Sequence, residues 1–251
     1  MLSKKPWRVE VVLFFCAAQA LCLFLGTALI AVLQKLGVSG FKNPEDFGNP
    51  LVATLSFQGA TWILIPIFLR LHGVKFRDAF GLKKDNWPIA LLLAAAVVVV
   101  ILPVAEVLVQ LSVQVLHHWG WKAHNEEAVT MLTGAKAFWM RLYLDFFAVV
   151  LAPVAEEFIF RGVLYSSLKQ LGQPKLAFFG VSALFALIHG DAAIGLSLFV
   201  LALALTWLYE KTDNLLAPIA AHSLFNLANL VMLHFQEPLN QLLQRIHLQL
   251  S

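Results

Sequence analysis

The sequence predicts an all-α protein, a polytopic transmembrane bundle of about seven or eight helices that encloses a polar cavity within the membrane. Its 251 residues are 60% hydrophobic and only 13% charged, with a mean hydropathy of +0.77. Soluble domains usually contain about 25% charged residues. Seven apolar segments follow one another along the chain, and most reach the ~20 residues that a helix needs to cross a bilayer. These observations indicate an integral, multi-pass membrane protein, and the small net charge of +3 gives no sign of a nucleic-acid partner.

The first four apolar segments are the longest, and we expect each to form a membrane helix. They span residues 9–34, 51–71, 88–116 and 137–165. The first is longer than the ~7–15 residue core of a cleavable signal peptide, which favours an uncleaved first span. The third and fourth exceed the length needed to cross, so they should be tilted, kinked or protruding. Pro103 and Pro153 lie inside them and mark the expected kinks.

The last three apolar segments are shorter. They span residues 175–189, 193–209 and 215–233, and the first of these is too short for a full crossing to be expected. We expect residues 234–251 to form an amphipathic tail in the membrane interface, with an eighth membrane element as the alternative. The chain is therefore treated as a single membrane domain, 1–251. It has N-terminal helices in 1–136 and helices that carry the polar motifs in 137–233.

Basic residues are unevenly divided between the two sides of this arrangement. Twelve of the 18 Lys and Arg residues lie on the side of the N-terminus and the other six on the opposite side. Cytoplasmic loops carry the excess of basic residues in membrane proteins. The N-terminus is therefore expected in the cytoplasm.

Two acids and an arginine interrupt the fourth apolar segment, in the motif Glu156-Glu157-x-x-x-Arg161. A charged residue in a membrane span costs ~2.5–3.5 kcal/mol on insertion scales, so it is usually retained for function. Glu157 and Arg161 are four residues apart and share a helical face, whereas Glu156 lies about 100° round the helix. The spacing predicts one acid held by the arginine and one acid free for chemistry.

Two further motifs place polar residues at helical spacing. They are Phe185-x-x-x-His189 and His222-x-x-x-Asn226. In each, the two marked residues share one face of a helix. Three helices could therefore direct Glu156, His189, His222 and Asn226 into one cavity.

This set of side chains suits hydrolysis by an activated water molecule. Desolvation in an apolar cavity makes a carboxylate a stronger base, which suits it to take a proton from water near neutral pH. A neighbouring imidazole can hold the same water or pass its proton on. An amide and a second imidazole can donate hydrogen bonds to the oxyanion of a tetrahedral intermediate, each worth about 2.7–4 kcal/mol of barrier. A Ser223 nucleophile is disfavoured because adjacent residues, here Ser223 and His222, point apart on a helix.

The three motifs, in this order and in polytopic sequence, resemble those of the CAAX-protease and bacteriocin-processing family, also called CPBP or Abi. The resemblance covers about residues 137–233 and implies an intramembrane glutamate endopeptidase. The implied substrate is a membrane-embedded or lipidated peptide, the surroundings are membrane lipids, and no cofactor is implied. The expected location is a bacterial cytoplasmic membrane. Within the family's pattern, Glu157 and Arg161 support the geometry of the site.

The resemblance also implies roles for the four remaining motif residues. Glu156 would be the base that activates water, with His189 assisting it. His222 and Asn226 would form the oxyanion site.

Three alternatives remain open from the sequence. Glu156, His189 and His222 could bind zinc with a water in the fourth position, although the two-histidine helical motif of common zinc peptidases is absent. Buried acids such as Glu106 and Asp145, together with the same motifs, could instead relay protons or bind an ion in a transporter. The absence of a multi-helix repeat argues against this second alternative. The third is a catalytically silent scaffold or immunity factor that retains the family's residues.

Each motif also has a plainer structural interpretation. His189 precedes Gly190, so it could be a helix-ending imidazole. His222 and Asn226 could make hydrogen bonds between helices, of the kind worth ~0.6–2 kcal/mol in membranes. Arg141 and Asp145, four residues apart, are expected to form a structural ion pair.

Overall fold

The computed structural model describes residues 2–43, 46–82, 87–121 and 138–250, without the side chains of 236–250. Every regular element within these ranges is helical, which confirms the predicted all-α class. The helices of the N-terminal half are α1 (Val9–Lys35), α2 (Gly48–Thr54), η1 (Leu55–Gly59), α3 (Ala60–His72), α4 (Phe76–Ala79) and α5 (Trp87–His118). Those of the C-terminal half are α7 (Phe138–Phe146), η2 (Phe147–Leu151), α8 (Ala152–Glu157), η3 (Phe158–Tyr165), α9 (Ser166–Gln170), α10 (Pro174–Ile188), α11 (Ala192–Thr212) and α12 (Leu216–Leu250).

Five helical stretches in the described part of the chain are long and apolar enough to cross a membrane. They are Val9–Lys35, Gly48–His72, Trp87–His118, Ala192–Thr212 and Leu216–Phe235. These agree within a few residues with five of the seven predicted segments. The chain is thus an integral membrane protein with several apolar helices.

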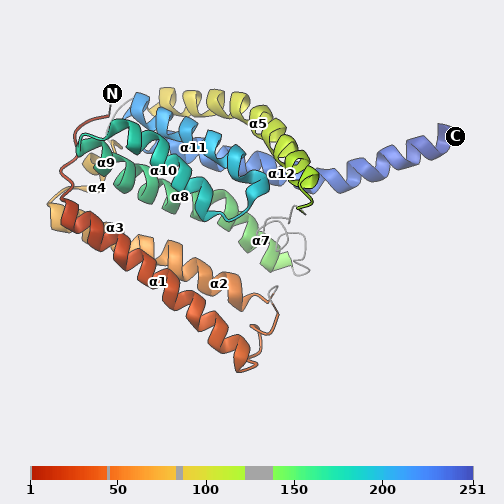
Figure 1. Cartoon of the computed structure of the whole chain (residues 1–251), viewed down its shortest axis with the longest axis horizontal. Coiled ribbons are helices and arrows are strands. Elements are labelled where there is room, and N and C mark those ends of the chain that lie inside the picture. The colour runs from red at the N-terminus through yellow and green to blue at the C-terminus, as the bar shows by residue number, and fades with distance from the viewer. Residues whose placement is uncertain (1, 44–45, 83–86, 122–137, 251) are drawn as a thin grey trace.

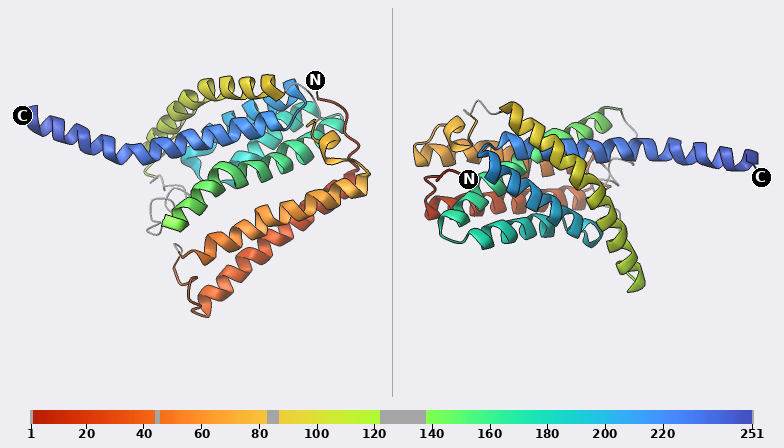
Figure 2. Two further views of the ribbon diagram at one scale, coloured as in Figure 1. Left: turned by 180° about the vertical axis from the view of Figure 1, so that it is seen from behind. Right: turned by 90° about the horizontal axis from the view of Figure 1, so that it is seen from above.

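The fourth predicted segment forms a rod that is helical from Phe138 to Gln170 but changes its winding along the way. Two of its parts, η2 and η3, are π-helical, with wider turns than an α-helix. Pro153 lies in the first turn of α8, directly after the π-helical turn η2. The irregularity expected at this proline therefore takes the form of a π turn, a feature frequently found at functional sites. Pro103 lies inside α5, which bends along its length (Figure 2).

The helices form two groups (Figure 1). In the first, α1 packs against α2, η1 and α3 as an antiparallel pair. In the second, α11 packs against α5, α10 and α12, and α12 also contacts η2 and α8. The C-terminal half of α12 projects away from the bundle in every view (Figures 1 and 2). The side chains of 236–250 lie outside the described residues, so the amphipathic character of the tail stays a prediction.

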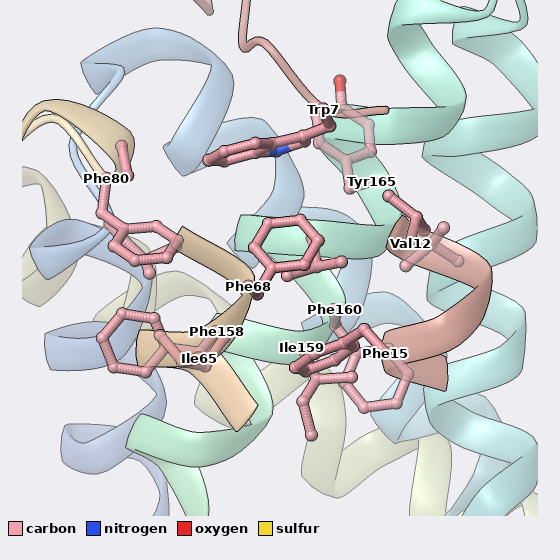
Figure 3. Packing of buried hydrophobic residues seen from close by; sticks show 14 of the residues in the cluster. Trp7, Val12, Phe15, Ile65, Phe68, Phe80, Phe158, Ile159, Phe160 and Tyr165 are labelled. Atoms are coloured by element: carbon pink, nitrogen blue, oxygen red, sulfur yellow. The ribbon is translucent and has the colours of Figure 1, made fainter. Parts of the chain in front are cut away.

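Aromatic side chains join the two groups (Figure 3). Trp7 contacts Phe68 edge-on, with ring centroids 4.9 Å apart, and Phe80 contacts Phe158 in the same way at 4.7 Å. The indole N–H of Trp7 also donates to the Gly162 carbonyl at 3.0 Å, and to a serine hydroxyl one turn further along the rod. The N-terminal segment is therefore fixed to the rod that carries the two glutamates.

A second core lies between α5, α11 and α12. Small residues of α5 and α12 face large leucines of α11, and all are buried: Ala90, Ala94, Leu201, Leu205, Leu208, Ala217 and Ala221. Small residues allow membrane helices to approach closely. This packing fixes α12, and with it His222, beside the rest of the bundle.

Candidate active site

The predicted pair of Glu157 and Arg161 is present and fully buried. Arg161 Nη1 lies 2.8 Å from Glu157 Oε1, and both side chains are 0% exposed. The other guanidinium nitrogen, Nη2, donates to the Ala202 carbonyl of α11 at 3.0 Å. The guanidinium carbon also lies 4.9 Å from the ring centre of Phe185 on α10. Arg161 therefore links the rod to α10 and α11. Removing one partner of a buried ion pair typically costs 3–5 kcal/mol.

His222 lies between the two glutamates. Its Nδ1 is 3.0 Å from Glu157 Oε1, and its Nε2 is 3.9 Å from Glu156 Oε2. The imidazole is almost completely buried and packs edge-on against Phe185, with ring centroids 5.7 Å apart. Because a carboxylate only accepts, Nδ1 carries the proton donated to Glu157. Nε2 is therefore the ring atom that faces Glu156.

Glu156 is placed differently from its neighbour Glu157. Its side chain is 13% exposed, whereas that of Glu157 is inaccessible. It interacts electrostatically with both His222 and His189. In the described part of the structure, the ion pair with Arg161 belongs to Glu157, so Glu156 is the acid left free, as the spacing predicts.

His189 closes α10. Its Nδ1 lies 2.7 Å from the Phe185 carbonyl, one turn back, and Gly190 follows with a left-handed φ of +70°. The helix-ending interpretation is therefore correct as a description of its local structure. Because a carbonyl only accepts, Nδ1 is the donor and Nε2 of the neutral ring is free to accept a proton. His189 can therefore end the helix through Nδ1 and act toward Glu156 through Nε2.

The helix that His189 closes is shorter than a membrane span. Helix α10 has 15 residues, a length of about 22 Å at 1.5 Å per residue. The hydrocarbon core is about 30 Å thick, so α10 does not cross fully, as its predicted segment indicates. Irregular backbone at membrane depth is tolerated only where protein covers it or water reaches it. Gly190 is exposed, so other parts of the described chain do not cover this end of the site.

Asn226 makes a different contact from the one its predicted role requires. It lies one turn after His222 on α12, and its Nδ2 donates to the Ala148 carbonyl of η2 at 2.8 Å. This is the interhelical hydrogen bond of the plainer interpretation. The amide has a second N–H, so an oxyanion role is still available to it. The structure thus brings Glu156, His189 and His222 together and fixes Asn226 beside them through the backbone of the rod.

Phe185 packs at the centre of this cluster, a position that its place in the motif does not by itself predict. Its ring contacts the guanidinium of Arg161, and the rings of His189 and His222, at centroid distances of 4.8 and 5.7 Å for the two histidines. It is fully buried. Its spacing of four residues before His189 is the one signal in the sequence that marks it. Phe185 forms the apolar wall against which the charged groups are arranged.

One expected contact is not formed, and one acid expected to be buried is exposed. The ion pair of Arg141 with Asp145 is not formed, and the buried Oδ1 of Asp145 has no hydrogen-bond partner among the described residues. Glu106 is exposed on α5 and accepts a hydrogen bond from Gln110 at 2.9 Å, so it does not face the polar cluster. In both cases spacing or position within an apolar run did not determine which way the side chain points.

Metal-ligand geometry is not apparent in the described part of the chain. No group of three His, Cys, Asp or Glu side chains there is arranged to hold a metal ion. Glu156, His189 and His222, the zinc ligands of the alternative hypothesis, therefore gain no support as a ligand set. The hypothesis itself needs a chemical test.

Comparison with known proteins agrees with this geometry. Residues 137–228 match the family model of the type II CAAX prenyl endopeptidase Rce1-like proteins. Every motif residue from Glu156 to Asn226 falls inside this segment. The similarity to the CAAX-protease and bacteriocin-processing family that the motifs predict is thereby confirmed for this part of the chain.

One curated relative is also similar to part of the chain. UPF0177 protein YxdF of Lactococcus lactis subsp. lactis (strain IL1403) is 34% identical over 79 residues. The aligned region is 31% of this chain and 43% of that protein, so the chain spans less than half the length of this relative. No solved structure matches the chain.

Proposed function

We propose that this chain is an intramembrane endopeptidase that hydrolyses a membrane-associated or lipidated peptide with a water molecule activated by Glu156. One observation carries the proposal: a buried imidazole, His222, is held between an arginine-paired glutamate and a second, partly accessible glutamate. Similarity to an endopeptidase family over residues 137–228 supports it.

In the proposed mechanism, Glu156 takes a proton from water and the hydroxide attacks the peptide carbonyl. The proton then passes to the departing amine, so that Glu156 is regenerated as the carboxylate. His189 assists through its free Nε2, either by holding the water or by moving the proton. Such general acid–base catalysis contributes about 10²–10⁴-fold to the rate.

His222 and the second N–H of Asn226 are proposed to donate to the oxyanion. Donation by His222 to the oxyanion requires an N–H on Nε2, the ring atom on the side of Glu156, while Nδ1 keeps its contact with Glu157. The Glu157–Arg161 pair therefore acts as a support that fixes the orientation of the imidazole.

The substrate class follows from the position of the site. The proposed catalytic groups lie in a bundle of membrane helices, and His222 and Asn226 are on the candidate span Leu216–Phe235. This supports delivery of the scissile bond by an apolar segment or a lipid. The matched family is described as a prenyl endopeptidase, and a prenylated C-terminus is therefore the first substrate to try. A prenylated protein is not an obvious substrate in a bacterium, so an unlipidated membrane peptide is the second. We propose a cytoplasmic membrane as the location and a cytoplasmic N-terminus, on the distribution of basic residues.

The test is cleavage by the purified full chain in lipid nanodiscs. A farnesylated peptide ending in a CAAX sequence and the same peptide without the lipid are incubated in H₂¹⁸O, and the products are analysed by mass spectrometry. We expect cleavage with one ¹⁸O atom in the new carboxyl group during a single turnover, and loss of cleavage in Glu156→Gln and His189→Ala. Undiminished cleavage by either variant would contradict the roles assigned here.

Two matched variants control for the loss of an acid or a histidine elsewhere in the membrane helices. Glu106→Gln changes an exposed acid of α5, and His234→Ala changes an exposed histidine of α12, whose Nδ1 contacts the carbonyl one turn back. Both should cleave like the parent chain.

The metal-dependent alternative is separated by chelation and by metal analysis of the active preparation. We propose that no cofactor is needed, so cleavage should survive 1,10-phenanthroline. The transporter alternative is weakened because Glu106, one of its proposed relay groups, faces away from the cluster. Proton-coupled flux that persists in Asn226→Ala would favour it. Absence of cleavage and of flux would leave the silent scaffold.

A further inference from the structure

We propose that Pro153 and Asn226 form a functional pair. Pro153 leaves the Ala148 carbonyl without a backbone donor, and Asn226 occupies that vacancy and is held there in one orientation. This inference rests on the proposed function for its catalytic consequence. The hydrogen bond from Asn226 to the Ala148 carbonyl, called the anchor below, is argued from geometry alone and is tested separately.

The Ala148 carbonyl lacks the donors that a helix normally supplies. In an α-helix its partner would be the N–H of Ala152, but in this π-helical turn that N–H bonds to the Phe147 carbonyl instead. In a π-helix its partner would be the N–H of residue 153, which is a proline and has none. Both backbone positions that could serve Ala148 are therefore unavailable.

Asn226 supplies the missing donor from another helix. Its Nδ2 lies 2.8 Å from the Ala148 oxygen, and η2 packs directly against α12. Inside a membrane bundle, an unsatisfied carbonyl is costly because little water is at hand to replace the lost partner. The bond therefore serves both partners: it satisfies the carbonyl and it fixes the amide.

A fixed amide has a fixed second N–H. The carboxamide group is planar, so a hydrogen bond through one N–H of Asn226 leaves the other with one direction. Pro153 also lies three residues before Glu156, so the anchor joins the helix of the base to the helix of the proposed oxyanion donors at a point close to both. Pro153 is thus a positioning residue, because it acts on the reaction through the Asn226 side chain.

A double-mutant cycle on thermal unfolding of the full chain in detergent tests the anchor. Pro153→Ala restores a backbone N–H that can reach Ala148, so Asn226→Leu should lower Tm by several °C in the parent and by clearly less in the Pro153→Ala background. Pro103→Ala, in the α5 helix, is the matched control and should leave the effect of Asn226→Leu unchanged. Equal effects of Asn226→Leu in the parent and in Pro153→Ala would overturn the anchor.

A second measurement decides the matter if the Asn226 variants do not fold. The chain is labelled with ¹⁵N in its asparagine side chains, and hydrogen exchange at the Asn226 amide is followed by NMR. Exchange should be slow in the parent and faster in Pro153→Ala, which retains the asparagine. Identical exchange in the two proteins would contradict the proposal.

The catalytic consequence is read from the cleavage assay. Pro153→Ala should lower kcat by about tenfold with KM unchanged, less than the ~10²–10³-fold that follows the loss of an oxyanion donor. If the double-mutant cycle shows that Pro153 and Asn226 are coupled but kcat is unchanged in Pro153→Ala, the pair has a structural role only. Absence of cleavage by the parent would refute the proposed function, whereas the unfolding cycle would still decide the anchor.

Discussion

Two π-helical turns in this protein are each held by an amide side chain from a neighbouring helix, and the two differ in what surrounds them. In η1, of the N-terminal pair, Gln19 of α1 donates to the Phe57 carbonyl at 3.0 Å. In η2, Asn226 of α12 donates to the Ala148 carbonyl at 2.8 Å. The contact is chemically the same in both places.

The surroundings of the two turns separate structure from function. The Phe57 carbonyl has local donors as well, the Thr61 hydroxyl at 2.8 Å and the backbone N–H of Ala60, so it does not depend on Gln19. The Ala148 carbonyl lies five residues before Pro153, which has no N–H to offer it, and its donor is Asn226. In η1 the carbonyl has hydrogen-bond donors nearby in the sequence, so the amide of Gln19 serves only packing between helices. In η2 the carbonyl needs the amide of Asn226, and this need also determines where that amide points.

The largest expected effect on stability concerns the ion pair of Glu157 with Arg161, which is buried in the second group of helices. Arg161→Met leaves Glu157 without its counterion in a site with no exposure, so we expect a loss of about 3–5 kcal/mol in the free energy of unfolding. Chemical unfolding in detergent, followed by circular dichroism, measures it. Lys169→Met is the control, because it removes a partly exposed cation that pairs with Glu210 on α11. A loss no greater in Arg161→Met than in the control would show that the buried pair contributes little.

The next effect concerns the two adjacent acids. Glu156→Gln should reduce kcat by about 10²–10⁴-fold, as expected for removal of a general base. Because Glu156 is partly exposed and the ion pair belongs to Glu157, the stability of this variant should stay within about 1 kcal/mol of the parent. Parallel measurement of kcat and of the unfolding transition tests the separation. A large loss of stability would mean that Glu156 holds the fold, and its loss of activity would then say nothing about a base.

Sequence reasoning reached the helices and the site for identifiable reasons. The apolar run at 9–34 corresponds to α1, because a membrane helix is defined by length and hydropathy alone. The contact of Glu157 with Arg161 followed from spacing, since four residues place two long side chains on one face. The same spacing failed for Arg141 and Asp145, because Arg141 is exposed and its long side chain is not confined to one direction.

The π turns and the orientation of His222 could not be predicted. A π turn depends on which N–H bonds to which carbonyl, as the Ala152 N–H does to the Phe147 carbonyl five residues back. The spacing of hydrophobic residues does not show whether an N–H bonds four or five residues back. The Nδ1 contact of His222 with Glu157 depends on how α12 packs against α8. Both are tertiary properties, fixed by the neighbouring helices.

A smaller effect is expected where the N-terminal segment meets the rod. Trp7→Phe keeps most of the ring packing against Phe68 but removes the N–H that donates to the Gly162 carbonyl and the Ser166 hydroxyl. We expect a loss of about 0.5–1.5 kcal/mol in the free energy of unfolding. Trp207→Phe is the control, since Trp207 is exposed and its recorded contact is with Lys211. Equal losses in the two variants would indicate that the indole bonds of Trp7 add nothing to stability.

An effect on stability of similar size sharpens the comparison of the two amides most. Gln19→Leu and Asn226→Leu each remove one interhelical hydrogen bond, typically worth about 0.6–2 kcal/mol in a membrane. Gln19→Leu should fall at the low end of this range, because Phe57 keeps its local donors, and it should leave kcat unchanged. Asn226→Leu should fall at the high end, because Ala148 is left without a donor, and it should lower kcat by ~10²–10³-fold. Unfolding and cleavage are measured on both variants, and a loss of activity in Gln19→Leu as large as in Asn226→Leu would show that both turns tune the site. If instead each variant lost activity only in proportion to its stability, Asn226 would be a second packing amide like Gln19, and the oxyanion would need another donor.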